Sequence, residues 1–135
     1  LQYPADILDS LDELDKIIIG SSEGNHIIEI GGPDGPVHLN SSLILSNPAQ
    51  GGEVHIASPI SSDGDLIIFG SGNTTHIGNG SGAYPNLDIT VAGDIIINDS
   101  VEIHGNATLE STGGRIIITG TVNSTAGNTY SLTLK

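Results

Sequence analysis

The chain is organised in short apolar blocks separated by turn-forming residues. From Lys16 onward, runs of Ile, Leu and Val alternate with Gly, Asn, Asp, Ser and Pro. Blocks of three to five residues with this composition predict short strands, and several alternate apolar and polar positions, as in Val54-His55-Ile56. The predicted strands are 16–20, 26–30, 37–39, 43–45, 53–56, 65–69, 87–91, 94–98, 101–104, 107–110, 115–119 and 131–134.

The spacing of these blocks predicts how the strands are arranged. Segment 93–98 recurs as segment 114–119, both with the pattern Gly-x-Ile-Ile-Ile, and in the same frame Leu109 stands near Tyr130. A period near 20 that holds three short strands is typical of one coil of a parallel β-helix. A β-sandwich would need longer strands paired by hairpins. We therefore predict an all-β fold, a single-stranded parallel β-helix (β-solenoid) of about six coils of ~20 residues over 16–135.

Residues 1–15 follow a different pattern. Apolar residues recur at helical spacing, acidic residues including Asp12 lie on the opposite face, and Pro4 suits a first helical turn. We predict a short amphipathic helix over about 5–15 that covers one end or side of the core, or serves as a docking element for a neighbouring copy. The candidate subunit-contact residues are Ile7, Leu8, Leu11 and Leu14, with Leu132 and Leu134 of the last predicted strand.

Two segments interrupt the strand pattern. Segment 46–53 contains Asn-Pro and Gly-Gly, and segment 70–86 is rich in Gly. Both are predicted to project from the solenoid as loops.

The charge balance and the missing residue types exclude several classes of function. The chain has 3 basic and 16 acidic residues, a net charge of -13, which argues against nucleic acid and anionic membranes as partners. Without Cys there is no disulfide framework, thiol nucleophile or zinc–thiolate site. No apolar run approaches the ~20 residues of a membrane span. The chain begins at Leu1 without Met, and we expect any targeting segment to lie upstream or to have been removed.

Carboxylates in turns are the candidates for metal and acid–base chemistry. Asp34, Asp63 and Asp65 are calcium candidates because Ca²⁺ prefers oxygen ligands, although the chain has no EF-hand loop and Asp in turns commonly accepts backbone N–H bonds. Asp63 and Asp65 would also be the acid and base of a polysaccharide-cleaving enzyme. The Arg, Lys and aromatic residues that position a sugar are scarce, and no Gly-x-Ser-x-Gly is present. We therefore expect neither an enzyme nor a bound cofactor.

Five histidines lie among the predicted strands and turns: His26, His38, His55, His76 and His104. In an alternating strand most of them point outward between inward aliphatic residues. None has the i, i+4 spacing or the neighbouring Cys of a dedicated metal site. We interpret them as surface histidines, with metal binding along one face of the solenoid as the alternative.

Asn-x-Ser/Thr triplets are more frequent than expected from composition, which predicts about two. They occur at Asn40, Asn73, Asn79, Asn98, Asn106 and Asn123. Such an excess is typical of a glycosylated extracellular surface. Solenoid corners also favour Asn, Ser and Thr, so both explanations stay open.

Two stretches resemble known surface proteins. The Ile-rich segment 94–124 resembles the repeats of filamentous haemagglutinin-like surface proteins, which are giant secreted parallel β-helices. The opening, from Ala5-Asp-Ile-Leu8 through Lys16-Ile-Ile-Ile-Gly-Ser-Ser-Glu-Gly24, is similar to the start of a module in large microbial β-strand-repeat adhesins. The resemblance implies secretion, a cell-surface or matrix location, and a role in adhesion or scaffolding. It carries no catalytic residues.

The function expected from the sequence is therefore structural. We expect an extracellular module that stacks end to end, as tandem repeats or as separate copies, to form a stiff acidic filament whose partners are copies of itself and, on the outside, glycans. The alternative is an adhesin module that binds carbohydrate or another surface through loops 46–53 and 70–86. A polysaccharide-lyase-type enzyme is the third alternative.

Overall fold

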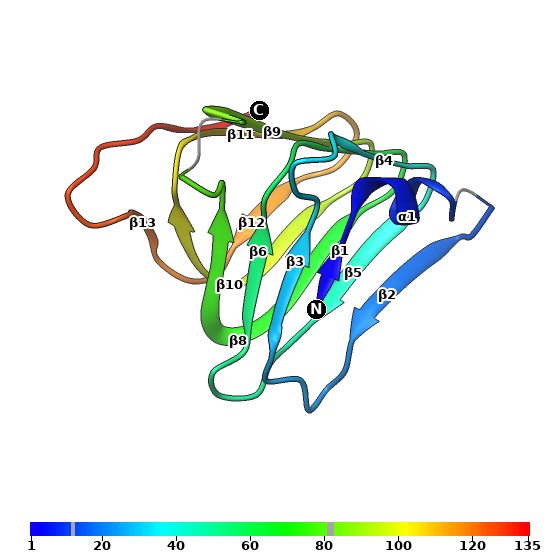
Figure 1. The fold of residues 1–135 in the computed structure, drawn as a ribbon, viewed down its shortest axis with the longest axis horizontal. Helices are drawn as coiled ribbons and strands as arrows, with labels where there is room; N and C mark the ends of the chain where they lie inside the picture. Colours follow the sequence, from blue (N-terminus) through cyan, green and yellow to red (C-terminus); the bar gives the residue numbers. More distant parts are fainter. Residues whose placement is uncertain (12, 81–82) are drawn as a thin grey trace.

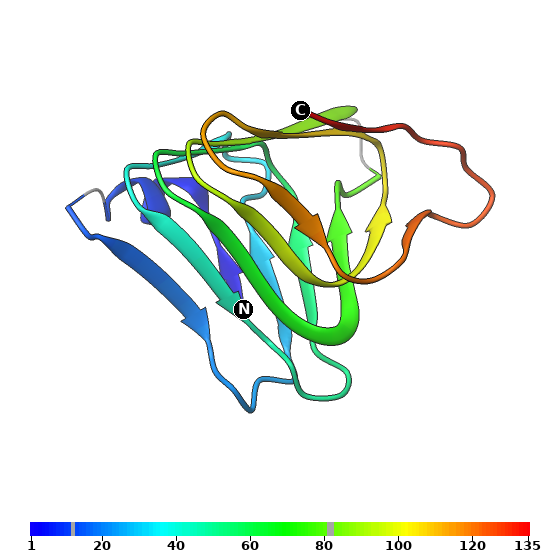
Figure 2. The same ribbon diagram turned by 180° about the vertical axis from the view of Figure 1, so that it is seen from behind.

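The structure, a computed structural model, describes residues 1–11, 13–80 and 83–135. It is a parallel β-solenoid of about five turns with one short helix near the N-terminus (Figures 1 and 2). The predicted fold class is confirmed. The coil number is five rather than six because most coils are longer than the predicted period. The coil that brings Asn106 beside Asn86 has about the predicted length. The coil that brings Ile89 beside Ile60 is much longer.

The strands form three faces, and every strand pair is parallel. The first face contains β2 (Lys16–Gly20), β5 (Ser42–Ser46), the first parts of β8 (Leu66–Ile77) and β10 (Ile95–Ile103), and β12 (Ile116–Ile118). The second contains β1 (Gln2–Tyr3), β3 (Ile27–Ile30), β6 (Glu53–Ile56), the second parts of β8 and β10, and β13 (Val122–Ser124). The third contains β4 (Val37–Leu39), β7 (Ile60–Ser62), β9 (Asn86–Val91), β11 (Asn106–Ser111) and β14 (Leu132–Leu134).

The core consists of aliphatic rows that run along the solenoid axis. Alternate side chains of each strand point inward, and the parallel register stacks each one on its equivalent in the next coil. One such row is Ile19, Leu45, Ile68, Ile97 and Ile118. Its members are buried up to the last coil, and each buried aliphatic side chain stabilises the fold by about 2 kcal/mol.

The helix is shorter than the predicted 5–15. The helix α1 spans Ala5–Asp9 only. The Ser10 hydroxyl donates a hydrogen bond to the Ile7 carbonyl, and the Leu11 N–H donates to Leu8 rather than continuing the helical pattern. These local bonds satisfy the terminal carbonyls and end the helix. Asp12, predicted on the polar face, lies outside the described residues.

The predicted loop 70–86 was wrong over its first half. Ser71 and Gly72 have φ of 53° and 93°, which turns the chain around a corner, and β8 then continues to Ile77. The connection between β8 and β9 is therefore 78–85, of which 81–82 lie outside the described residues. The predicted loop 46–53 corresponds to residues 47–52, which connect β5 to β6 and belong to neither strand.

A carboxylate is buried inside the corner of β10. Asp99 is 1% exposed. Its Oδ2 accepts a hydrogen bond from the Thr75 hydroxyl (3.1 Å) and its Oδ1 from the Ser100 N–H (3.0 Å). Burial raises the pKa of the Asp99 carboxyl above its ordinary value of 3.8, while these two hydrogen bonds act in the opposite direction.

We expect Asp99→Asn to make the protein more stable at pH 7. Between the ordinary pKa and the raised pKa, the folded state holds a proton that the unfolded state has lost, so the wild type loses stability as the pH rises through this window. The asparagine side chain of the variant does not titrate, so it adds no pH dependence to the stability over this range. Urea unfolding of both proteins from pH 4 to pH 7 measures this, and the advantage of the variant should shrink toward pH 4. A stability difference that does not change with pH would contradict the assignment.

No helix within residues 1–11, 13–80 and 83–135 combines the length and the apolarity needed to cross a bilayer.

Candidate functional site

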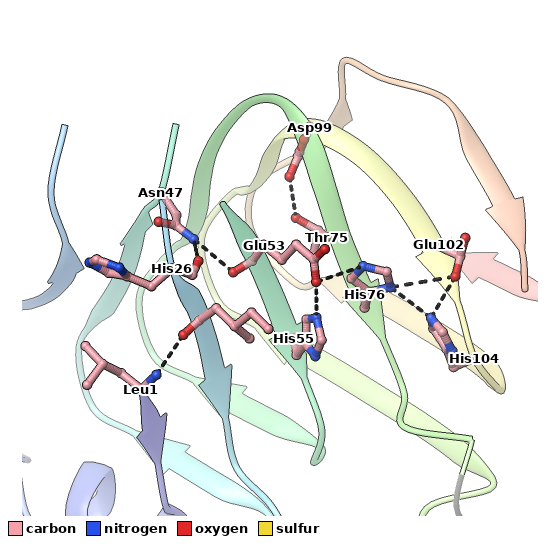
Figure 3. A network of polar contacts seen from close by, with 11 residues as sticks. Leu1, His26, Asn47, Glu53, His55, Thr75, His76, Asp99, Glu102 and His104 are labelled. Atoms are coloured by element: carbon pink, nitrogen blue, oxygen red, sulfur yellow. Dashed lines mark hydrogen bonds and ion pairs between the residues drawn. The ribbon is translucent and has the colours of Figure 1, made fainter. Parts of the chain in front are cut away.

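One outward row on the second face gathers ionisable side chains from successive coils. The register places in this row Gln2, Glu29, His55, His76, Glu102 and Asn123. Residues two apart in a strand point to the same side, so Glu53 on β6 lies beside His55. His104 follows the end of β10 and lies beside Glu102. We call Glu53, His55, His76, Glu102 and His104 the His–Glu cluster (Figure 3).

Polar contacts connect all five members of the cluster. His55 Nε2 is 2.8 Å from Glu53 Oε2, and His76 Nε2 is 3.7 Å from the same oxygen. On the other side of the ring, His76 Nδ1 is 2.9 Å from His104 Nε2 and 3.7 Å from Glu102 Oε1. His104 Nε2 is 3.0 Å from that Glu102 oxygen. The central His76 therefore faces a carboxylate with each ring nitrogen (Figure 3).

Burial and neighbouring imidazoles favour the neutral form of His76. Its side chain is 19% exposed, and its ring centroid lies 4.5 Å from that of His55 and 5.1 Å from that of His104. Desolvation and these two histidines lower the pKa of His76 below 6.5, against the opposing effect of Glu53 and Glu102.

A hollow of about 280 Å³ opens beside the cluster. His55, His76 and His104 line it together with Gly78 and Asn79. Solvent and solutes therefore reach the imidazole edges directly, although the rings themselves are half-buried.

The calcium candidates lie apart from this cluster. Asp34 and Asp63 are exposed, and Asp65 Oδ1 accepts the Asp94 N–H at 2.7 Å, a structural bond at the coil corner. The described chain has two groups of three metal-ligating side chains within reach of one ion, and both are drawn from the His–Glu cluster. Asp34, Asp63 and Asp65 are therefore not brought together with other ligands of that kind.

The Asn residues of the predicted glycosylation sites lie at the surface, with one half-buried. Asn40, Asn79, Asn98, Asn106 and Asn123 are exposed. Asn73 is half-buried, and its Nδ2 donates to the carbonyls of Asn47 (3.1 Å) and Ala49 (2.8 Å). Ser81, which completes the triplet of Asn79, lies outside the described residues. Glycosylation stays a prediction.

The predicted subunit-contact residues at the N-terminus divide between core and surface. Leu8 is buried in the core and Leu11 packs against it, whereas Ile7 and Leu14 are exposed. The helix α1 lies against β4, where Asp9 Oδ1 accepts the His38 N–H at 2.8 Å. β1 pairs with β3, and at this end of the solenoid β1 and β2 are edge strands (Figure 1).

The C-terminal coil is open. Val122 and Leu134 are 43% and 53% exposed, whereas their partners one coil earlier, Val101 and Leu109, are 1% and 0% exposed. Leu132 is half-buried and packs against the core. Inward apolar positions that are covered in the preceding coil are thus exposed to solvent here.

The outer side of the first face carries a row that the sequence analysis did not identify. Equivalent outward positions on its five strands are all isoleucine: Ile18, Ile44, Ile67, Ile96 and Ile117. Ile18 is exposed and the other four are half-buried. This apolar stripe follows the flank of the solenoid rather than its end.

Comparison of the chain with family models, with curated proteins and with solved structures gave no match.

Proposed function

We propose that the chain is a structural module of a secreted fibre or large surface protein, in which solenoid coils stack end to end into a stiff acidic rod. The observation that carries this proposal is the open C-terminal coil, whose apolar side chains continue the inner rows of the core. In this proposal the next coil is that of a neighbouring module, joined as a tandem repeat or present as a separate copy.

The physical argument concerns both side chains and backbone. An uncovered end of a parallel solenoid presents a strand edge with unpaired N–H and C=O groups beside exposed apolar residues, which together form a template for another coil. At the N-terminal end α1 lies against β4, but β1 and β2 each pair with a single strand, so their outer edges can accept the open coil of the next copy. The net charge of -13 disfavours unspecific association of separate rods.

We expect the purified chain to associate as its concentration rises, and Val122→Lys to prevent this. In the free chain a lysine at position 122 can extend into solvent, but a stacked coil would bury its charge without a partner, at a cost of several kcal/mol. Sedimentation velocity measures the assembly state, and electron microscopy shows the length of the particles. Wild-type particles should be rods several times longer than one chain.

Ile96→Lys is the matched control, because it places the same charge on the flank of an inner coil. It should leave end-to-end association unchanged. A wild type that stays monomeric at high concentration, or loss of association in Ile96→Lys rather than in Val122→Lys, would contradict stacking through the open coil.

A further inference from the structure

We propose that the His–Glu cluster binds one divalent transition-metal ion of the zinc class, held by Nδ1 of His76, Nε2 of His104 and Oε1 of Glu102. Glu53 is assigned as the positioning residue that orients His76. This site is independent of the stacking proposed above, because it lies on the outer side of the second face.

The three donor atoms already converge. They are separated by 2.9, 3.0 and 3.7 Å. Tetrahedral zinc with bonds of about 2.0–2.1 Å to nitrogen and oxygen requires ligand atoms about 3.3 Å apart. The observed distances lie on both sides of that value, so small side-chain rotations are enough to bring all three donors to one ion.

The other ring nitrogen of His76 faces a carboxylate that lies just beyond hydrogen-bond distance, so a small rotation of either side chain brings the two within reach. A histidine that binds metal through one nitrogen commonly directs the N–H of the other nitrogen at a carboxylate, which fixes the tautomer and strengthens the metal bond. His76 Nε2 lies 3.7 Å from Glu53 Oε2, on the side opposite to Glu102. His55 Nε2–H in turn donates to that oxygen at 2.8 Å and holds the carboxylate in place.

The surroundings favour a cation. The adjacent hollow gives solutes access to His76 and His104, two of the three proposed ligands. The chain as a whole carries a net charge of -13, which raises the local concentration of cations.

The donor set selects the class of metal. Two imidazole nitrogens and one carboxylate oxygen suit Zn²⁺ and neighbouring first-row ions, whereas Ca²⁺ and Mg²⁺ prefer sites built of oxygen atoms. The His₂Glu set with one open position is a type found in catalytic zinc sites. Here we assign only binding.

Titration calorimetry with zinc chloride, and equilibrium dialysis with metal analysis, test the proposal on the full chain. We expect saturable binding of one Zn²⁺ per chain, no comparable binding of Ca²⁺, and loss of saturable binding in His76→Ala. Glu102→Gln, which is nearly isosteric and leaves the backbone unchanged, should weaken binding more than tenfold. Glu53→Gln should weaken it by about tenfold to a hundredfold, as the loss of an orienting carboxylate does.

The controls are His26→Ala and His38→Ala, because both residues are exposed histidines outside the cluster. They should bind Zn²⁺ like the wild type, and circular dichroism shows whether each variant is folded. Wild-type affinity in Glu102→Gln, or equal losses in the control variants, would overturn the site. Two ions per chain, with one lost in His55→Ala, would overturn the assignment of Glu53 as a positioning residue.

Discussion

Replacing Ile68 by alanine is expected to lower the free energy of unfolding by about 2–5 kcal/mol. Ile68 is fully buried in the middle coil and stacks between Leu45 and Ile97. Truncation removes apolar contacts and leaves a cavity that the coils on either side prevent from closing. Urea unfolding followed by circular dichroism measures the loss.

The neighbouring residue supplies the control. Ile67 has the same side chain on the same strand but points outward and is half-buried. Ile67→Ala should therefore cost less than about 1 kcal/mol, since substitutions outside the core have small effects. Similar losses for both variants would mean that β8 does not alternate between core and surface as the structure shows.

The second large effect is expected for Gly20→Ala, at the corner that follows β2. A Cβ atom there would lie 2.0 Å from the Ser46 carbonyl oxygen of the next coil, and Gly20 has a φ of 100°. The positive φ costs an alanine about 1–2 kcal/mol. Because the obstacle is backbone, the two coils must also separate, at a cost of about 1–3 kcal/mol. The two costs together should lower the free energy of unfolding by roughly 2–5 kcal/mol. Thermal and urea unfolding both measure this loss.

Gly51→Ala separates the two contributions. Gly51 has a similar φ of 89°, and nothing lies within 4 Å of the position of its Cβ. This variant should show only the conformational cost of about 1–2 kcal/mol. If Gly51→Ala were as destabilising as Gly20→Ala, close packing of coils at Gly20 would not be the cause.

The sequence was sufficient to predict the faces of the solenoid but not the length of its coils. The repeated Gly-x-Ile-Ile-Ile segments do pair, with Ile95 beside Ile116 as the repeat predicts. Leu109, however, pairs with Leu134 rather than standing near Tyr130. The connection after β13 contains extra residues, and such insertions at solenoid corners change the offset without disturbing the inward alternation.

The short strands β1, β7 and β13 were not predicted for a related reason. They have two or three residues, and β7 reads Ile-Ser-Ser, too short and too polar for a local pattern to identify. Their pairing depends on a neighbouring coil as a template, which is tertiary information.

Metal binding by histidines along one face was the alternative drawn from the sequence, but which histidines and glutamates form the His–Glu cluster was not predicted, because this depends on those same coil lengths. His55 and His76 align under the predicted period, but the coil that joins His76 to Glu102 is longer than that period. A uniform period would place Ile97 beside His76 instead. The available signal was local: His55 and Glu102 each stand between two inward aliphatic residues, so both had to point outward. Only the structure shows which side chains of the neighbouring coils they face.

The parallel register of the coils is the central claim, and paired cysteines test it most directly because the natural chain has none. Ile67 and Ile96 are register partners that both point outward, and neighbouring strands are about 4.8 Å apart, within the range for a disulfide. The double variant Ile67→Cys, Ile96→Cys should form an intramolecular disulfide under mild oxidation. In the shifted variant Ile67→Cys, Asn98→Cys, the second cysteine lies two positions further along the strand, and no disulfide should form. Equal crosslinking of both pairs, or of neither, would contradict the solenoid register.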